Sequence, residues 1–442
     1  MRFFSYVCSM KSQLLIGAAS SGSGKTTFTL GLLRALRTRG LAVQPFKCGP
    51  DYIDTQYHTM AAGNESVNLD SYLSSAGHIR ELYARYGAGA RVCVTEGVMG
   101  LLDGYDGMKG SSAEIAGLLD LPVVLLVNAK STAYSVAPLI YGFKHFCSDL
   151  RIAGVVFNKV ASPAHYASLL QACRDVGVES LGYLPFRKDM EIPSRHLGLT
   201  LEVGFRFDAF TGRIAELVET HVDIDRLLEV TASPFPVVPV AGATAGTGCG
   251  SPSDLKIVVA RDEAFNFMYR ENIARLQQAG TVTFFSPLTD SVLPEAGLVY
   301  LPGGYPEFFL PRLSSNTSML ASIKRYAEAG GKIWAECGGM MYLCRSVIGM
   351  DGKSYPMADI FPLEATMEQM KLKLGYRQFR YGGGTWRGHE FHYSRIAGSY
   401  PSVATLSNAR NESVPTPLYR YKNVLAGYTH LYWGEQNVFD LF

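Results

Sequence analysis

A short segment rich in glycine and serine, ASSGSGKT at residues 19–26, is the first part of the chain whose residue types could do chemistry. An apolar run, QLLIGAA at 13–19, precedes it and predicts a buried strand. The following stretch, TTFTLGLLRALRTRG, predicts a helix that stops at Gly40. A strand, a glycine-rich turn and a helix N-terminus in this order direct backbone N–H groups toward a bound phosphate. The segment therefore predicts a phosphate-binding loop.

This loop departs from the usual pattern at one position, because Ala19 stands where the pattern has glycine. Gly24, Lys25 and Thr26 match the rest of the pattern. In such loops the lysine neutralises the β and γ phosphate oxygens, and the hydroxyl ligates magnesium. A chance turn rich in glycine and serine is the alternative interpretation, but the strand–loop–helix context disfavours it. We expect a nucleotide to bind here together with Mg²⁺.

Charged residues cluster in two further segments, KCGPDYID at 47–54 and TEGVMGLLDG at 95–104, each next to the end of a predicted strand. The residues concerned are Lys47, Asp51, Asp54, Glu96 and Asp103. Magnesium is usually held by one or two carboxylates together with phosphate oxygens. Each carboxylate alone is best interpreted as a solvated loop charge. At neighbouring strand ends beside a phosphate loop, they together favour a metal–phosphate site.

A second centre of chemistry is predicted at Cys337, in the sequence ECGG directly after the apolar run KIWA. A sharp strand-to-helix turn followed by glycine exposes a nucleophile. A thiolate at such a turn can attack an amide carbon, and a helix N-terminus would help to lower the pKa of the thiol. The alternative is a buried structural thiol, which the adjacent Gly-Gly disfavours. The segment LPGGYPE at 301–307 follows the end of another predicted strand. The N–H groups of Gly303 and Gly304 are candidates for an oxyanion hole. Taken alone, the segment is more simply interpreted as a tight turn.

A general base for this cysteine must come from elsewhere in the chain, and three histidines compete for the role: His389, His392 and His430. The first two lie in GHEFHYS, where a strand histidine satisfied by its neighbours is the ordinary expectation. Glu390, in the same segment, is a candidate for orienting the base.

Short runs rich in Val, Leu and Ile alternate with helical stretches, which predicts parallel sheets with ligand sites at the carboxyl ends of their strands. The predicted strands are 42–49, 91–97, 122–129, 151–160, 255–262, 281–287, 297–304 and 332–337, with helices around 268–279 and 316–329 in the second half. A stretch dominated by Pro, Gly, Ser and Thr separates the two halves. We therefore predict two α/β domains, at 12–230 and 255–442, joined by a linker at 231–254. The tail, 364–442, reads as strands.

The overall composition limits the classes of partner. Net charge is +2, from 41 Lys and Arg against 39 Asp and Glu, so we expect no nucleic-acid partner. No apolar run is long enough for a membrane span, and the eight cysteines form no metal-binding or disulfide pattern. The start, MRFFSYVCSMKSQLLIGAA, is faintly similar to a signal peptide, but it leads directly into the phosphate loop. We expect a cytoplasmic protein and leave open whether it is a homodimer.

These segments together resemble a known family. ASSGSGKTT, KCGPDYID, NLDSYL and TEGVMGLLDG in the first half closely resemble the cobyrinic acid a,c-diamide synthases of corrin biosynthesis. LPGGYPE, ECGGMMYL, LGYR, GHEFHYS and THLYW in the second half are similar to the glutaminase domain of that family. The resemblance covers nearly the whole chain in order. It implies two α/β domains: a P-loop parallel sheet similar to dethiobiotin synthetase, and a class I glutamine amidotransferase-like domain.

The resemblance also implies roles at matching positions of the first half. The residues implied for the ATP phosphates are Gly22, Gly24, Lys25, Thr26 and Thr27, and those implied for magnesium are Thr26, Asp51 and Glu96. Lys47 is implied to stabilise the transferring phosphoryl group, and Asp103 to act with Asp51 and Glu96 in substrate activation. Asn128 and Asn158 are implied as contacts of the adenine.

In the second half, the resemblance implies Cys337 as the nucleophile and favours His430 as the base. The usual glutaminase triad has a glutamate two residues after the histidine, but position 432 is Tyr. A Cys–His pair without that glutamate is therefore expected.

The implied reaction couples the two halves. ATP activates a tetrapyrrole carboxylate as an acyl phosphate, and ammonia cut from L-glutamine displaces the phosphate to form an amide. Three other interpretations stay open: an a,c-diamide synthase acting on nickel-sirohydrochlorin, a cobyric acid synthase, and a non-catalytic regulatory P-loop protein.

Overall fold

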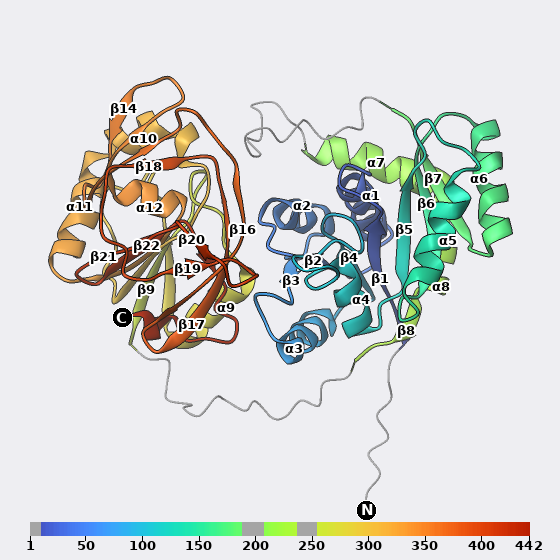
Figure 1. Ribbon diagram of the computed structural model, residues 1–442, viewed down its shortest axis with the longest axis horizontal. Helices are drawn as coiled ribbons and strands as arrows, with labels where there is room; N and C mark the ends of the chain where they lie inside the picture. The colour runs from blue at the N-terminus through green and yellow to red at the C-terminus, as the bar shows by residue number, and fades with distance from the viewer. Residues whose placement is uncertain (1–9, 188–206, 237–253) are drawn as a thin grey trace, which may run out of the picture. The chain divides into compact units, whose positions relative to one another are not determined.

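The computed structural model describes residues 10–187, 207–236 and 254–442 (Figure 1). The chain divides into two compact units, Met1–Ala243 and Thr244–Phe442. Both units are α/β, and the predicted strands and helices are present to within a few residues of their expected ends.

The first unit is built on a sheet that contains eight strands among the described residues, and seven of these run parallel in the order β3-β2-β4-β1-β5-β6-β7. The strands are β1 (Met10–Ala18), β2 (Val43–Cys48), β3 (Val67–Leu69), β4 (Val92–Glu96), β5 (Val123–Asn128), β6 (Ile152–Val160) and β7 (Ser180–Pro185). The eighth, β8 (Ala232–Pro234), pairs antiparallel with the start of β1. Because β8 belongs to this sheet, the predicted linker start at residue 231 is wrong. The later part of the predicted linker lies outside the described residues.

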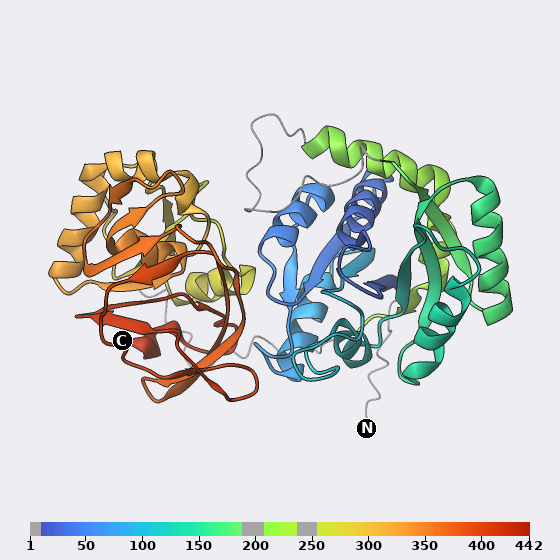
Figure 2. The same cartoon turned by 45° about the horizontal axis from the view of Figure 1, so that its top comes forward.

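Helices cover both faces of this sheet (Figures 1 and 2). On one face pack α1 (Lys25–Thr38), α2 (Ile53–Ala62), α7 (Phe207–His221) and α8 (Ile224–Val230), and on the other face pack α3 (Ala76–Gly87), α4 (Ser112–Leu119), α5 (Val136–Phe146) and α6 (Pro163–Val176). Alternation along β1 accounts for the two cores, because Leu14 and Ile16 join one cluster and Leu15 joins the other. All three side chains are fully buried, which explains why the strand reads as a continuous apolar run.

The second unit has a central sheet in the order β10-β9-β11-β12-β22-β21, in which only β21 runs antiparallel to its neighbour among the described strands. Its strands are β9 (Lys256–Ala260), β10 (Thr281–Phe285), β11 (Leu298–Leu301), β12 (Lys332–Glu336), β21 (Leu418–Tyr421) and β22 (Val424–Gly427). The helices of this unit are α9 (Arg270–Ala279), α10 (Leu310–Ser315), α11 (Thr317–Glu328) and α12 (Gly338–Leu343), with 3-10 turns η2 (Pro306–Phe308) and η3 (Val438–Leu441).

Two smaller sheets complete the described part of this unit. The tail predicted at 364–442 supplies most of their strands, as its strand-like composition predicts, and it also supplies β21 and β22 of the central sheet. The first sheet, of four strands, contains β13 (Cys344–Ile348), β14 (Ser354–Pro356), β15 (Phe361–Thr366) and β18 (Arg395–Ala397). The second, of five strands, contains β16 (Lys373–Tyr381), β17 (Gly384–His392), β19 (Leu406–Ser407), β20 (Ser413–Val414) and β23 (His430–Leu431). Register places His389 on β17 directly opposite His430 on β23.

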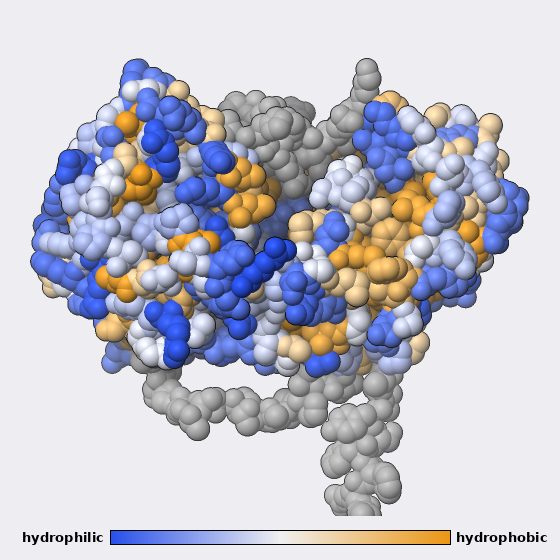
Figure 3. Space-filling model, viewed as in Figure 1, coloured by the Kyte–Doolittle hydropathy of each residue, from blue (hydrophilic) through white to orange (hydrophobic). Residues whose placement is uncertain are grey.

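Apolar side chains also gather on one face of the first unit, around α4 and α5 (Figure 3). On α5, Leu139, Tyr141 and Phe146 are exposed, and Phe146 is 72% exposed. Within the described ranges, no helix combines the length and apolar character that crossing a membrane requires.

Candidate functional site

The phosphate loop joins β1 to α1, and its backbone is held by a neighbouring strand. Gly24 has φ of 97°, in the left-handed region that glycine adopts without strain. Asn158, near the end of β6, donates from Nδ2 to the carbonyl of Ser23 at 2.8 Å. A Cβ at Gly24 would lie only 2.1 Å from that same nitrogen. The glycine is thus required twice, for its backbone angle and for the close approach of Asn158.

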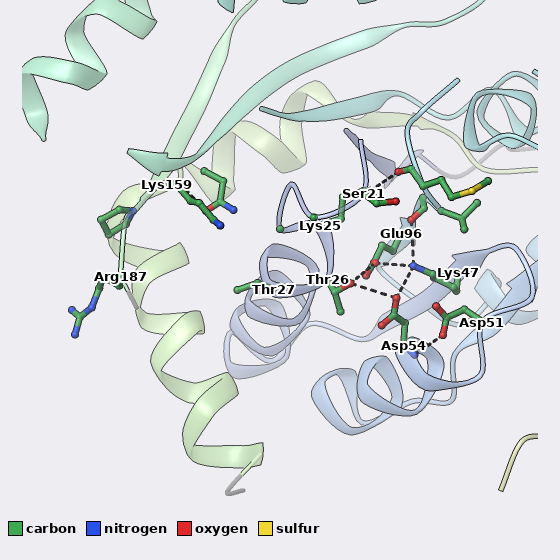
Figure 4. Close-up of a pocket in the computed structure, with 17 residues that line it drawn as sticks. Ser21, Lys25, Thr26, Thr27, Lys47, Asp51, Asp54, Glu96, Lys159 and Arg187 are labelled. Atoms are coloured by element: carbon green, nitrogen blue, oxygen red, sulfur yellow. Dashed lines mark hydrogen bonds and ion pairs between the residues drawn. The ribbon is translucent and has the colours of Figure 1, made fainter. Parts of the chain in front are cut away.

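A cavity of about 610 Å³ opens over this loop at the carboxyl ends of the parallel strands (Figure 4). Its lining includes Gly22, Gly24, Lys25, Thr26, Thr27, Lys47, Asp51, Asp54, Glu96, Asn158, Lys159 and Arg187. Such an edge is where open α/β sheets bind their ligands. Nearly all residues predicted for the nucleotide site therefore line one cavity.

Lys47 is the centre of a buried ion network in this cavity (Figure 4). Its Nζ lies 2.8 Å from Asp54 Oδ2 and 2.8 Å from Glu96 Oε1. The Thr26 hydroxyl donates to the same Glu96 oxygen at 2.8 Å and lies 3.4 Å from Asp54 Oδ2. Register between β2 and β4 places Lys47 opposite Glu96, so the sheet itself brings the two charges together.

His58, one turn of α2 after Asp54, is also part of this network. Its Nε2 lies 2.6 Å from Glu96 Oε2, and both side chains are fully buried. Burial alone would raise the pKa of Glu96, but Lys47 and His58 reverse this and hold that pKa well below its ordinary value. Burial would likewise lower the pKa of Lys47, but the carboxylates of Asp54 and Glu96 raise it. The two groups therefore remain charged, whereas burial lowers the pKa of Lys25 on the phosphate loop.

The oxygen atoms around Thr26 fit a magnesium ion that shares its ligands with phosphate. Glu96 Oε1 and Asp54 Oδ2 both lie within hydrogen-bond distance of Thr26 Oγ1. No group of three His, Cys, Asp or Glu side chains in the described part of the chain is arranged to hold a metal by itself.

The remaining predicted residues of the first unit lie in different places. Asp51 lines the cavity, but its Oδ1 accepts from the backbone N–H groups of Ile53 and Asp54 at 2.9 and 2.8 Å, so it also caps the start of α2. Asp103 accepts from the Gly100 N–H at 3.0 Å, and Asn128 accepts from the Lys130 N–H at 3.0 Å. Neither Asp103 nor Asn128 lines the cavity.

One residue of the network, His58, was not predicted as part of the site. Asp54 was named among the charges of the expected metal–phosphate site, but no individual role was assigned to it. Their spacing offered a signal, because residues four apart lie on the same face of a helix. The sequence alone did not show that Glu96, 38 residues after His58 and at the end of a strand, contacts this face of the helix.

In the second unit, Cys337 occupies a strained turn between β12 and α12. Its φ of 48° and ψ of −104° are unusual for a residue with a side chain. A Cβ at Gly338 would lie 2.8 Å from Pro306, and one at Gly339 would lie 2.1 Å from the Leu301 carbonyl. The turn therefore has the geometry of a nucleophile elbow, and both glycines are sterically required.

Gly303 and Gly304 lie beside this elbow. The Gly304 nitrogen is 3.3 Å from the position that a Cβ on Gly338 would take. A Cβ on Gly303 would lie 2.2 Å from Cε1 of His430, so the imidazole packs directly on that glycine. The chain thus assembles the cysteine, both predicted oxyanion glycines and His430 in one place.

The other two histidines are engaged elsewhere. His392 Nε2 lies 2.7 Å from Glu390 Oε1, its Nδ1 lies 2.7 Å from the Ser394 carbonyl, and its ring stacks on Tyr428 at 3.5 Å. His389 packs edge-on against Tyr376. These contacts leave His430 as the histidine that the geometry favours for the base.

Burial dominates the electrostatics of this second site. Burial, followed by the charge of Glu307, raises the pKa of Cys337 well above its ordinary value, although the Gly338 N–H lowers it. The predicted lowering by the helix N-terminus is therefore outweighed in the ligand-free protein, because α12 has only six residues and the thiol lies in an apolar core. Burial also lowers the pKa of His430 to about 3, so the imidazole is neutral and able to accept a proton.

One chain thus combines a phosphate-loop cavity that contains a carboxylate–lysine network with a cysteine elbow that contacts a histidine. This combination defines a class of protein, the glutamine-dependent, nucleotide-using ligases that form amides. Comparison with known proteins agrees. The family described as the CobQ/CobB/MinD/ParA nucleotide binding domain matches residues 14–199, and the CobB/CobQ-like glutamine amidotransferase domain matches residues 256–438.

Individual relatives match over almost the full chain. The "Cobyrinate a,c-diamide synthase" of Listeria innocua serovar 6a is 39% identical over 96% of this chain and 97% of its own length. The "Hydrogenobyrinate a,c-diamide synthase" of Brucella suis biovar 1 is 42% identical over 86% of this chain and 89% of its own length. The chain therefore belongs to the cobyrinate and hydrogenobyrinate a,c-diamide synthase family, and the resemblance seen in its motifs is confirmed.

Proposed function

We propose that this protein uses ATP and glutamine to amidate, in succession, the a and c acetate carboxylates of cobyrinic acid or hydrogenobyrinic acid in cobalamin biosynthesis. The observation that carries the proposal is the buried Thr26–Lys47–Glu96 network over a phosphate loop, in a chain that also carries the strained Cys337 elbow. A nucleotide-binding module without catalysis needs neither a buried lysine between two carboxylates nor an elbow.

The first unit activates the substrate. A carboxylate is a poor electrophile because its oxygen is a poor leaving group. The carboxylate oxygen attacks the γ-phosphorus of ATP, the bond to the β-phosphate bridging oxygen breaks, and an acyl phosphate and ADP form. Lys25 and the loop N–H groups hold the phosphates, and Lys47, whose charge is secured by two carboxylates, stabilises the transferring phosphoryl group.

Magnesium, when bound, neutralises charge on the β- and γ-phosphate oxygens. Thr26 and Glu96 are the residues proposed to hold it, with Asp54 beside them and Asp51 at the edge of the same cavity. His58 keeps one Glu96 oxygen engaged, which leaves the other directed at Thr26 and Lys47.

The second unit supplies ammonia. Cys337 Sγ attacks the side-chain amide carbon of glutamine, and His430 takes the thiol proton and delivers it to the leaving ammonia. Water then hydrolyses the thioester to glutamate. The N–H groups of Gly303 and Gly304 remain the proposed donors to the oxyanion, and we add that of Gly338, beside the elbow, as a further candidate. Ammonia attacks the acyl phosphate, and phosphate leaves.

The test is the ATP-, Mg²⁺- and glutamine-dependent mass change of cobyrinic acid, hydrogenobyrinic acid and nickel-sirohydrochlorin, measured side by side. Each exchange of OH for NH₂ makes the product slightly lighter. Two steps on either corrin substrate support the proposal. Two steps on the nickel substrate alone assign the protein to a different tetrapyrrole, and no amidation of any substrate overturns the assignment.

Two further parts of the proposal concern the state of the protein. The six cysteines among the described residues are free thiols, which suits a reducing compartment, and we place the protein in the cytoplasm. The exposed apolar side chains of α5 suit a subunit interface, and we propose a homodimer. Analytical ultracentrifugation of the wild type beside Phe146→Asp tests this, because a monomer in both samples would refute it.

A further inference from the structure

The glutamate expected two residues after the glutaminase histidine is not present in this sequence. Position 432, where that glutamate is expected, is Tyr432, which is buried and packs edge-on against Tyr269. Glu390, the other candidate, has its Oε1 at His392, while its Oε2 accepts from Thr416 at 2.8 Å and pairs with Arg377. Tyr432 supplies no carboxylate, and the carboxylate of Glu390 is bonded to His392, Thr416 and Arg377.

A different carboxylate faces His430. Glu336, the residue directly before the nucleophile, has its Oε2 at 3.7 Å from Nδ1 of the neutral His430, slightly longer than a hydrogen bond. Both side chains are about 1% exposed. Hydrogen bonds to the ligand-free form of a catalytic site are often long and shorten when substrate binds. The contact joins the end of β12 in the central sheet to β23, which follows β22, the parallel neighbour of β12.

The Glu336 carboxylate is itself held in place by three donors. Trp334 Nε1 donates to Oε1 at 2.6 Å, and the Leu431 N–H donates to Oε1 at 2.9 Å. The Tyr300 hydroxyl donates to Oε2 at 2.8 Å. One of these donors is the residue next to His430, so the carboxylate fixes both the backbone and the ring of that segment. A buried carboxylate with this many donors is built for a particular orientation.

We propose that Glu336 is the positioning residue of the glutaminase site, replacing the glutamate that is absent at position 432. This inference rests on the proposed roles of Cys337 and His430. The carboxylate accepts the proton on Nδ1 of His430, which leaves Nε2 as the unprotonated nitrogen. Nε2 takes the proton from the Cys337 thiol as Sγ bonds to the amide carbon, and the imidazolium so formed is stabilised by the Glu336 charge. The same proton then passes to the departing ammonia.

The variant Glu336→Gln tests this role with nearly unchanged volume. The amide oxygen can still accept from Trp334 and Leu431, but the amide NH₂ group now faces His430 Nδ1. A donor there favours the tautomer with the proton on Nε2, which cannot accept from the thiol. We expect kcat for glutamine hydrolysis to fall about 10²- to 10⁴-fold, with KM for glutamine within about threefold of wild type.

Two controls separate this effect from a loss of structure. Amidation driven by ammonium chloride bypasses the glutaminase and should be unchanged in Glu336→Gln. Glu364→Gln is the matched substitution in the same unit, because Glu364 is half-buried, bonds Ser346 and has no part in the site. Its glutamine-dependent rate should equal that of wild type. Glu336→Gln with a glutaminase kcat within about threefold of wild type overturns the proposal.

A measurement on the wild-type protein decides the question even if the variant does not fold. Long-range ¹H–¹⁵N NMR of the ring nitrogens at about pH 8 reports which nitrogen of His430 carries the proton. The proposal requires the proton on Nδ1, and a proton on Nε2 overturns it. Cys337→Ala tests the proposed nucleophile separately. If Cys337→Ala still hydrolyses glutamine, the assignment of Cys337 as the nucleophile is wrong. If Cys337→Ala is inactive but Glu336→Gln is fully active, only the positioning role of Glu336 is refuted.

Discussion

Alanine at Gly303 should disable the glutaminase while leaving the rest of the enzyme active. The Gly303 backbone does not lie in the left-handed region, so alanine adds a steric conflict and no backbone strain. Its Cβ would lie 2.2 Å from His430 Cε1, 3.0 Å from Nδ1 and 3.2 Å from Nε2. The ring or the loop must therefore move to restore an ordinary contact.

The size of that movement sets the expected effect. An ordinary contact begins near 3.4 Å, so the imidazole and the loop must separate by about 1.2 Å. Displacement of a catalytic group by about 1 Å costs on the order of 10²-fold in rate. We therefore expect kcat for glutamine hydrolysis to fall about 100-fold, and overpacking to destabilise the unit by about 1–3 kcal/mol.

The assay is glutamate release at saturating glutamine, beside amidation driven by ammonium chloride in the same preparation. The ammonium-driven rate should stay at the wild-type value, because it does not use the elbow. Gly384→Ala is the matched control, since the nearest atom to its Cβ would be Trp386 Nε1 at an acceptable 3.4 Å. If Gly303→Ala hydrolyses glutamine within about threefold of wild type, His430 is not the base or does not act from this position.

Three further predictions concern both units. Lys47→Met removes the cation that pairs with the buried carboxylates of Asp54 and Glu96. Ammonium-driven amidation should therefore fall more than about 10²-fold, and calorimetry should show the first unit destabilised by about 3–5 kcal/mol. Amidation at the wild-type rate would contradict the role of Lys47. Thr26→Val should weaken Mg²⁺ binding in a calorimetric titration with ATP, and Thr26→Ser should restore it; equal affinity in both variants would exclude the hydroxyl as a ligand. Burial raises the pKa of Glu336 to about 7, so its protonated form stabilises the folded state below about pH 4.5 and this contribution is lost as pH rises through 7. Relative to Glu336→Gln, the wild type should lose about 3 kcal/mol of unfolding free energy between pH 4.5 and pH 7. Unfolding can be monitored by the fluorescence of the three tryptophans, which all lie in the second unit. A difference in unfolding free energy that does not change with pH would show that the carboxyl pKa is not raised.

Local patterns predicted the parts of this protein that are encoded within a few residues. The strand–loop–helix order around residues 19–26 identified the phosphate loop, and the position of Cys337 between an apolar run and Gly-Gly identified the elbow. Alternation of apolar and helical runs predicted two parallel sheets. Each of these signals arises from neighbouring residues, because backbone geometry and burial pattern act over one or two turns of chain.

Pairings between distant strands decided the rest. The antiparallel partner of β1 is β8, more than 200 residues away, and its sequence reads as a linker because three strand residues carry almost no periodic signal. Residue types and spacing left three candidate histidines, and only the family resemblance favoured His430. The structure adds the physical reason, because His430 packs on Gly303 whereas His392 is bonded to Glu390.

The charges around each site were likewise assembled only by the tertiary structure. His58 and Glu96 meet because α2 packs beside the end of β4, and Glu336 meets His430 because β12 and β22 are parallel neighbours that both lead into the site. A sequence specifies that a glutamate is present, but its protonation and its partner depend on burial and on charges from other strands. The residue types therefore indicated the chemistry that we propose for this protein, whereas the fold brought the particular histidine and carboxylates proposed for it into contact.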